Sequence, residues 1–250
     1  PLHSSAASDV YKRQSLASDA WSALSKNRAA WYSAIALTTM VLLVLLGPLV
    51  SPYEVDQTNW SKLAKPPSMQ DGHVFGTDDL GRDLFVRTMY GGRISLMVGI
   101  VATLVSVLIG VSYGAISGFV GGKVDSIMMR IVDVLYAMPF LFFVILLMVF
   151  FGRSIFLIFV AIGAVNWLDI ARIVRGQTLT IKGKEFVDAA TAGGVSTFRI
   201  IFRHIVPNLM GIVVVYVALT VPQVILVESF LSFLGLGVQE PMTSWGALVN

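Results

Sequence analysis

Three carboxylates, Asp133, Asp169 and Glu228, lie inside otherwise apolar stretches of the sequence. An ionisable group at bilayer depth costs at least about 2.5 kcal/mol, so each is a candidate for substrate contact or proton transfer. Asp133 follows Arg130 by three residues and Asp169 precedes Arg172 by three, spacings at which helical side chains meet. For these two we expect local ion pairs near the inner interface rather than substrate contact. Glu228 has no basic neighbour in sequence, so it either lines a transport pathway or sits at the outer interface.

Other catalytic or metal-binding patterns are not found in the sequence. The chain has no cysteine, and its acidic residues between 51 and 93 do not follow the spacing of a calcium-binding loop. It contains no H-E-x-x-H or G-x-x-x-x-G-K-[ST] motif. His204 suggests a proton relay, but it lies in a polar loop, where hydrogen bonding or packing is the better interpretation. We therefore predict no catalytic residue, no metal site and no ATP-binding site in this chain.

The composition is that of an integral membrane protein. Hydrophobic residues make up 56% of the chain and charged residues 13%, with a mean hydropathy of +0.77, whereas a soluble domain has roughly 25% charged residues. The net charge of +3 is small, and the basic residues lie in loops between apolar runs, which argues against nucleic-acid binding. Five apolar runs are candidates to cross a hydrocarbon core of ~30 Å. They cover residues 29–50, 94–120, 127–151, 155–168 and 209–236.

Two polar segments flank the first apolar run. Residues 1–28 form an N-terminal tail, of which 1–14 resemble translated cloning sequence and are set aside. Residues 51–93 form an outer loop with a balanced set of acids and bases. We expect a short interfacial helix within this loop, capped by Thr77 or Asp78.

Residues 94–236 form the membrane core, interrupted by a polar loop at 171–208. Small residues are frequent in the second apolar run, which favours close helix packing inside the bundle. With the N-terminus inside, twelve basic residues fall on the inner side and six on the outer side, which supports this orientation. Five spans then place residues 237–250 outside, and we expect the chain to be truncated before a sixth span.

The polar stretch at 183–208 is the feature that the apolar runs must position. Its apolar residues recur at helical spacing on either side of Gly193 and Gly194. We predict two short helices joined by a glycine turn, because glycine adopts the left-handed conformation without a Cβ clash. Pro207 marks the point where the chain re-enters the membrane. Such a loop is either a docking surface for another protein or a helix lying passively on lipid headgroups.

The loop resembles the E-A-A-x-x-x-G signature of bacterial ABC importer permeases, which it matches through Asp188, Ala189, Ala190, Gly194, Val206 and Pro207. Asp188 stands where Glu is usual and Val206 where Leu is usual, while His204 resembles the peptide-importer branch. Further blocks extend the resemblance over most of residues 17–250, including FGTDDLGRDLFVR, GGRISLMVG and ESFLSFLGLGVQEP. The chain most resembles the C-type inner-membrane subunit of oligopeptide permeases, and resembles dipeptide or nickel permeases less closely.

The resemblance implies an all-α integral membrane protein with the polytopic type I importer permease fold, with five spans present of an expected six. It implies a homologous permease subunit as a heterodimeric partner, two ATP-binding-cassette ATPase subunits and a periplasmic peptide-binding protein. The partner ATPases would bind ATP and Mg, and this chain would carry no cofactor. The ATPase-coupling residues would be Glu185, Asp188, Ala189, Ala190, Gly193, Gly194, His204 and Pro207.

The function implied is transport of oligopeptides across the bacterial inner membrane by alternating access, without enzymatic activity in this chain. Closure of the ATPases would push on the loop and tilt the fourth and fifth spans, with Pro139 and Pro222 as bending points. Dipeptide or nickel transport in the same family stays open as an alternative. A proton-coupled secondary transporter is the alternative from another class, with Asp133, Asp169 and Glu228 as coupling groups.

Overall fold

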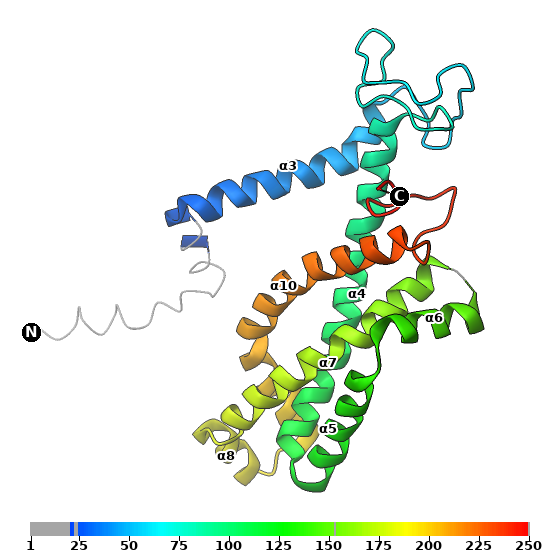
Figure 1. Ribbon diagram of the computed structural model, residues 1–250. Helices are drawn as coiled ribbons and strands as arrows, with labels where there is room; N and C mark the ends of the chain where they lie inside the picture. Colours follow the sequence, from blue (N-terminus) through cyan, green and yellow to red (C-terminus); the bar gives the residue numbers. More distant parts are fainter. Residues whose placement is uncertain (1–20, 23–24, 153, 250) are drawn as a thin grey trace, which may run out of the picture. The chain divides into compact units, whose positions relative to one another are not determined.

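The computed structural model describes residues 21–22, 25–152 and 154–249, and regular structure in this part of the chain is entirely helical (Figure 1). The expected artefactual segment at 1–14 lies outside the described residues. Four of the described helices are long and apolar enough to cross a membrane, and a sharply bent helix pair supplies a fifth candidate. The predicted all-α membrane fold is confirmed for the described residues.

The chain separates into two compact units, 1–51 and 52–250. The first unit contains helix α3, Arg28–Val50, which covers the first expected span. Asn27 caps this helix by accepting a hydrogen bond from the Ala30 amide at 3.2 Å. Most large apolar side chains of α3 are exposed, as is typical of a helix surrounded by lipid.

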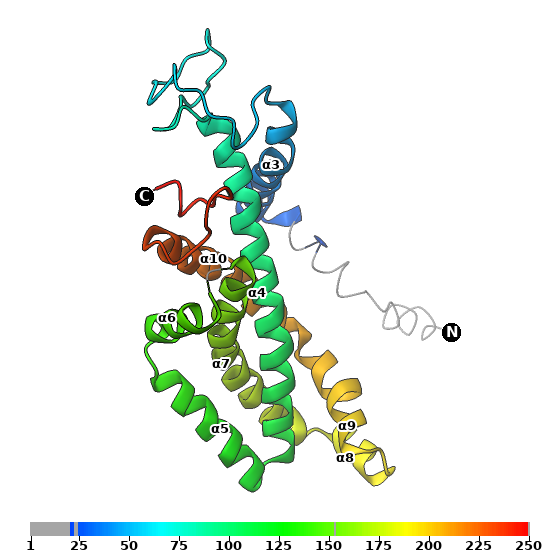
Figure 2. The ribbon, with the colours of Figure 1, turned by 90° about the vertical axis from the view of Figure 1, so that its right-hand side faces the viewer.

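The second unit is arranged around the long helix α4 (Leu84–Val120). Helix α7 (Ile155–Lys182) packs along α4 (Figures 1 and 2). The α4–α5 turn, the end of α7 and helix α8 gather at one end of α4, called here the α8 end, and the loop at 52–83 lies at the opposite end. In chain order the helices are α4 Leu84–Val120, α5 Gly122–Ala137, α6 Phe140–Phe151, α7 Ile155–Lys182, α8 Glu185–Ala192, α9 Thr197–Ile200, the π-helix η1 Ile201–Ile205 and α10 Val206–Phe233.

A row of glycines brings the backbones of α4 and α7 into close contact. Gly110, Gly114 and Gly118 recur every four residues, so they share one face of α4. A Cβ atom on Gly110 would lie 2.7 Å from the Ile170 Cβ, and one on Gly118 would lie 2.8 Å from the Arg175 carbonyl oxygen. The small residues of the second apolar run therefore pack inside the bundle as expected, against α7 in particular.

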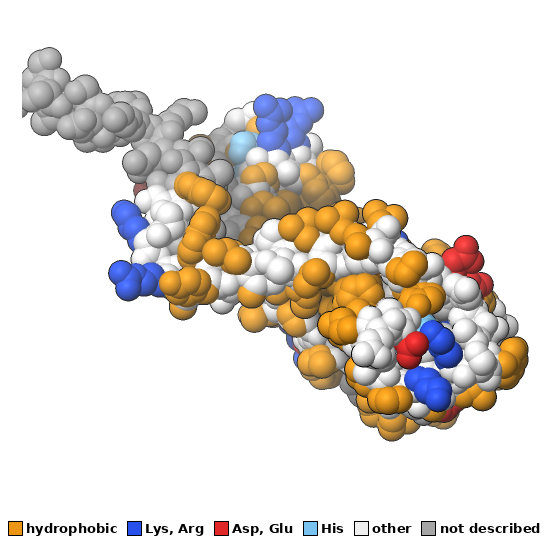
Figure 3. All heavy atoms as spheres, turned by 90° about the horizontal axis from the view of Figure 1, so that it is seen from above, with side chains coloured by type: hydrophobic (Ala, Val, Ile, Leu, Met, Phe, Trp, Pro, Cys, Tyr) orange, Lys and Arg blue, Asp and Glu red, His pale blue; other side chains and the backbone are white. Residues whose placement is uncertain are grey.

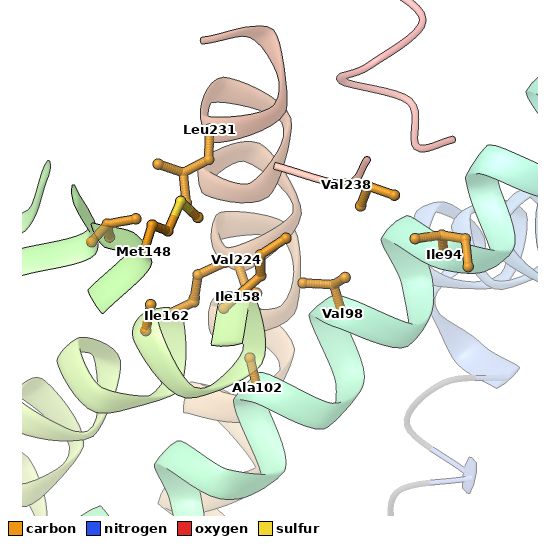
Figure 4. Close-up of a cluster of buried hydrophobic side chains, with 11 residues drawn as sticks. Ile94, Val98, Ala102, Met148, Ile158, Ile162, Val224, Leu231 and Val238 are labelled. Atoms are coloured by element: carbon orange, nitrogen blue, oxygen red, sulfur yellow. The ribbon is translucent and has the colours of Figure 1, made fainter. Parts of the chain in front are cut away.

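Side chains from α4, α6, α7 and α10 form a buried core (Figure 4). Val98, Ile162 and Val224 are fully buried where α4, α7 and α10 meet. Leu231 and the C-terminal Val238 extend this core toward the end of α10. Hydrophobic side chains are also spread over the surface visible in Figure 3, as expected where a chain faces lipid or another membrane subunit.

The third expected span, at 127–151, is not one straight helix. Helices α5 and α6 meet at an angle of 85°. Pro139 explains the break, because it lacks an amide hydrogen and disfavours a helical conformation in Met138, which is extended. The expected bend at Pro139 is therefore present, whereas Pro222 lies within the continuous helix α10.

The fourth expected span, at 155–168, is too short. Helix α7 continues to Lys182, although Arg172 and Arg175 indicated a loop from residue 171. Arg172 and Arg175 belong to this helix, and their guanidinium groups form ion pairs with carboxylates of α5. The polar connection to α10 consequently begins only at Gly183.

The outer loop at 51–93 contains no separate short helix. Its last ten residues belong to α4, which begins directly after Asp83. Asp83 is the cap, and its Oδ1 accepts a hydrogen bond from the Val86 amide at 2.8 Å. The expected cap at Thr77 or Asp78 is therefore wrong. Both side chains accept hydrogen bonds within the loop instead, Thr77 from the Lys65 amide and Asp78 from the Leu80 amide.

Asp78 organises a tight turn in this loop. Its carboxylate accepts hydrogen bonds from the amides of Leu80 and Arg82 at 2.9 Å and from Arg82 Nε at 2.7 Å. Burial raises the pKa of the Asp78 carboxyl, but these hydrogen bonds outweigh burial and hold its pKa below the ordinary value. Arg82 also donates to Glu240 at 2.9 Å, which joins the loop to the C-terminal segment.

The glycine contact between α4 and α7 gives a direct test. Gly114→Ala would place a Cβ against the Ala171 carbonyl oxygen and 2.9 Å from the Arg175 amide nitrogen. We expect the free energy of unfolding of the purified protein in detergent to fall by about 1–3 kcal/mol. Gly176→Ala on α7 is the matched control, since a Cβ there meets no atom within 4 Å. Equal stability of the two variants would contradict the close packing.

Candidate functional site

The polar connection between α7 and α10 begins with helix α8. Glu185 and Asp188 occupy its first turn, where carboxylates interact favourably with the helix dipole. The helix ends at Gly193, and Gly194 has a φ of +75°, in the left-handed region. The amide of Val195 then donates back to the Ala190 carbonyl at 3.1 Å. The expected first helix and glycine turn are therefore present.

The second expected short helix is not separate from the membrane helix. Helix α9, the π-helix η1 and α10 follow one another without a break, from Thr197 to Phe233. The Val206 amide donates to the Ile201 carbonyl, five residues back, just before Pro207, which has no amide hydrogen. A π-turn of this kind rotates the residues on either side of it, and such turns are frequent at functional sites.

The connection has one buried face. Val187 of α8 is 2% exposed and packs with Ile200, Ile201 and Ile205. The same cluster includes side chains of α4, α7 and α10, namely Val111, Ala115, Ile170, Val174, Leu209 and Val213. A displacement of α8 would therefore act on three long helices through continuous packing.

The other face of the connection is open. Phe186 is 40% exposed on α8 and Phe198 is 70% exposed on α9. Of the predicted coupling residues, the exposed ones are Glu185, Asp188, Ala189, Gly193, Gly194 and Pro207. Ala190 and His204 are half-buried. The structure thus places six of the eight at the surface of the α8 end.

An ion pair that sequence spacing did not indicate joins α5 to α7 next to this connection. Arg175 donates from two nitrogens to the two oxygens of Asp125, each at 2.6 Å, and Ser117 of α4 also donates to Asp125. Lys182, at the end of α7, donates to the Phe119 carbonyl. These contacts fix the α4–α5 turn to α7, immediately before the chain enters α8.

The expected local ion pairs of Asp133 and Asp169 are wrong. Asp133 pairs with Arg172 of α7 at 2.7 Å and not with Arg130 of its own helix. The Arg172 guanidinium also lies 4.4 Å from the centre of the Tyr136 ring. The packing of α5 on α7 brings these groups together, whereas spacing within one helix only permits a contact.

The Glu228 side chain is fully buried, so it lines no open pathway in this structure. It accepts hydrogen bonds from Ser95 at 3.0 Å and from Ser232 at 2.6 Å. Ser95 in turn accepts the Trp245 amide, and Ser232 contacts Ser244 at 3.2 Å. Glu228 thus anchors the C-terminal segment to α4 and α10 and is shielded from any pathway in this conformation.

Asp169 has a different position. Its side chain is exposed and forms no hydrogen bond or ion pair with another described residue. It lines a cavity of about 310 Å³ between α5, α6, α7 and α10. The other lining residues are Leu135, Tyr136, Met138, Phe140, Val165, Asn166, Gln223 and Val227. Within the described residues, no cluster of three His, Cys, Asp or Glu side chains could hold a metal ion.

Comparison with known proteins identifies relatives over nearly the whole chain. Residues 106–250 match the family described as binding-protein-dependent transport system inner membrane component, and residues 15–67 match the N-terminal TM domain of oligopeptide transport permease C. The chain is 60% identical to the oligopeptide transport system permease protein OppC of Escherichia coli, covering 95% of this chain and 78% of that protein. It is 49% identical to the dipeptide transport system permease protein DppC of Bacillus subtilis, covering 97% and 76%.

The Asp125–Arg175 pair can be tested by a double-mutant cycle. We expect Asp125→Asn and Arg175→Gln each to lower the free energy of unfolding by about 1.5–3 kcal/mol, because two charged hydrogen bonds are lost from a partly buried site. The double variant should lose less than the sum of the two. The same cycle on Asp133 and Arg172, which are more exposed, is the control and should give a coupling of about 1 kcal/mol or less. No coupling between Asp125 and Arg175 would contradict the clamp.

Proposed function

Because the chain belongs to the family of binding-protein-dependent transport system inner membrane components, we propose that it is the permease subunit through which oligopeptides cross the bacterial inner membrane. Transport occurs by alternating access, and the N-terminus and the α8 end face the cytoplasm. The observation that carries this proposal is α8, a short helix with an exposed face and a buried contact to three long helices. The relatives named for oligopeptides support the choice of substrate class.

The energy source lies in other subunits. The sequence has no phosphate-binding loop, so ATP and Mg are bound by two ATP-binding-cassette ATPase subunits on the cytoplasmic side. A homologous permease subunit completes the membrane pathway, and a periplasmic binding protein delivers the peptide. The exposed residues of α8, including Glu185, Phe186 and Asp188, offer both charge and apolar area to an ATPase surface.

The packing supports a mechanical route from α8 to the membrane. Val187 transmits the movement of α8 to α7 and α10 through the cluster it shares with Ile201 and Ile205. The Asp125–Arg175 pair carries α5 along with α7. Helix α6 lies beyond the break at Pro139, where it meets α5 at an angle of 85°.

A proton-coupled carrier is the contrasting function. Two of its three candidate coupling groups already have partners within the chain. Asp133 forms an ion pair, and the buried Glu228 accepts hydrogen bonds from two serine hydroxyls. Membrane vesicles that hold the complete system distinguish the two functions. Peptide uptake should require ATP and persist when the proton gradient is collapsed. Uptake driven by a proton gradient without ATP would overturn the proposal.

The glycine turn is the first test of the coupling surface. Gly194→Val places a β-branched residue at a φ of +75°, which costs about 1–2 kcal/mol locally and distorts the turn after α8. We expect ATP-dependent uptake to fall several-fold while the protein still inserts in the membrane. Gly183→Val is the control, because its φ is −85° and a Cβ there meets no atom within 4 Å. Unchanged uptake in Gly194→Val would refute a mechanical role for the turn.

The charge of α8 gives a second test. Asp188→Lys reverses an exposed charge in the first turn of α8, where a cation is also unfavourable for the helix dipole. We expect weaker retention of the ATPase subunits in a pull-down from solubilised membranes, with normal membrane insertion. Asp79→Lys, an exposed aspartate in the loop at 52–83, is the charge-matched control and should retain the ATPases. Full retention by Asp188→Lys would remove α8 from the ATPase contact.

A further inference from the structure

The cavity beside Asp169 lies next to the break at Pro139. Met138 and Phe140, on either side of the break, both line it, and α5 and α6 meet there at 85°. Its volume of about 310 Å³ lies at the lower end of the ~300–1,000 Å³ range of small-ligand sites. The cavity is therefore large enough for part of a peptide but not for a whole oligopeptide.

The cavity carries one uncompensated negative charge. Asp169 has no cationic partner among the described residues. The cation closest in sequence, Arg172, is occupied by Asp133 at 2.7 Å and by the Tyr136 ring. A carboxylate in a membrane-crossing helix is costly to keep unpaired, so a cationic ligand group would stabilise this site on arrival.

The other polar groups favour a hydrogen-bond donor as ligand. Asn166 donates one Nδ2 hydrogen to the Ile162 carbonyl at 3.0 Å, and its amide oxygen stays available to accept a hydrogen bond from a ligand. Gln223 of α10 adds a second amide at the cavity surface. The remaining walls are mostly apolar, and they suit an uncharged side chain next to the cation.

We propose that this cavity is a subsite for the amino-terminal residue of a translocating peptide, with Asp169 binding its α-ammonium group. That the ligand is a peptide follows from the proposed function, on which this inference rests. An α-ammonium beside an apolar side chain matches the charge, the acceptors and the apolar walls together. Asn166 and Asp169 lie on α7 and Gln223 lies on α10, the two helices that α8 and its turn connect. A movement of the coupling surface would thus reach both polar walls of the cavity.

Labelling of an introduced cysteine tests the subsite without relying on the binding protein. The chain has no cysteine, so Val227→Cys gives one thiol in the cavity wall of this subunit. The assembled complex in detergent is labelled with a fluorescent maleimide, in the presence of trialanine or N-acetyl-trialanine, and its subunits are separated on a gel. We expect trialanine to protect the thiol at about tenfold lower concentration than its acetylated form, because acetylation removes a charged hydrogen bond.

Variants at Asp169 then assign the effect. Asp169→Asn should raise the half-protecting concentration of trialanine about tenfold, and Asp169→Glu should restore most of the protection. Asp79→Asn, in the exposed outer loop, is the matched control and should behave as the parent. If Asp169→Asn fails to assemble, the comparison of the two peptides on the parent complex still shows whether the subsite binds an α-ammonium group.

Equal protection by both peptides, or protection by neither, would overturn the subsite. Protection by neither is also the result expected if a cationic side chain of the partner permease occupies Asp169. ATP-dependent uptake of trialanine is measured in parallel in vesicles that hold the complete system. Uptake without amine-dependent protection rejects the subsite alone, whereas absence of ATP-dependent uptake rejects the proposed function.

Discussion

The close contact between α4 and α7 is the constraint on which the second unit depends. Lipid offers no hydrophobic drive for two apolar helices to associate, so their attraction must come from dispersion contacts at short range. Gly110, Gly114 and Gly118 allow this range because their missing side chains let the α7 backbone approach. The α7 backbone opposite this row includes Arg175, so the contact also fixes where the charged groups of α7 can reach.

The ion pairs to α5 follow from that placement. With α7 held against α4, Arg172 and Arg175 meet Asp133 and Asp125 of the neighbouring helix. Pairing allows both arginines to remain in a helix that continues to Lys182. The α8 end is thereby assembled as one body, in which the α4–α5 turn, the end of α7 and the start of α8 are held together by charge and packing.

The proposed coupling surface and the proposed peptide subsite use the same two helices. Helix α7 carries Asp169 and leads into α8, while α10 carries Gln223 and continues from the π-turn at 201–205. The break at Pro139 borders the cavity, because Met138 and Phe140 on its two sides line it. Glu228, in contrast, is held with Ser95 and Ser232 in a buried network that binds the C-terminal segment.

The membrane class, the approximate apolar runs, the glycine turn at Gly194 and the bend at Pro139 could all be predicted from the sequence. These features depend on local chemistry, namely hydropathy, the missing Cβ of glycine and the missing amide hydrogen of proline. The partners of Asp133 and Glu228 depend on tertiary packing, because Arg172 and Ser95 reach them from other helices. The cap of α4 at Asp83 was missed for a related reason, since the loop fold commits Asp78 to its own turn. Spacing within a helix shows only which side chains can meet, whereas the packing between helices determines which of these contacts form.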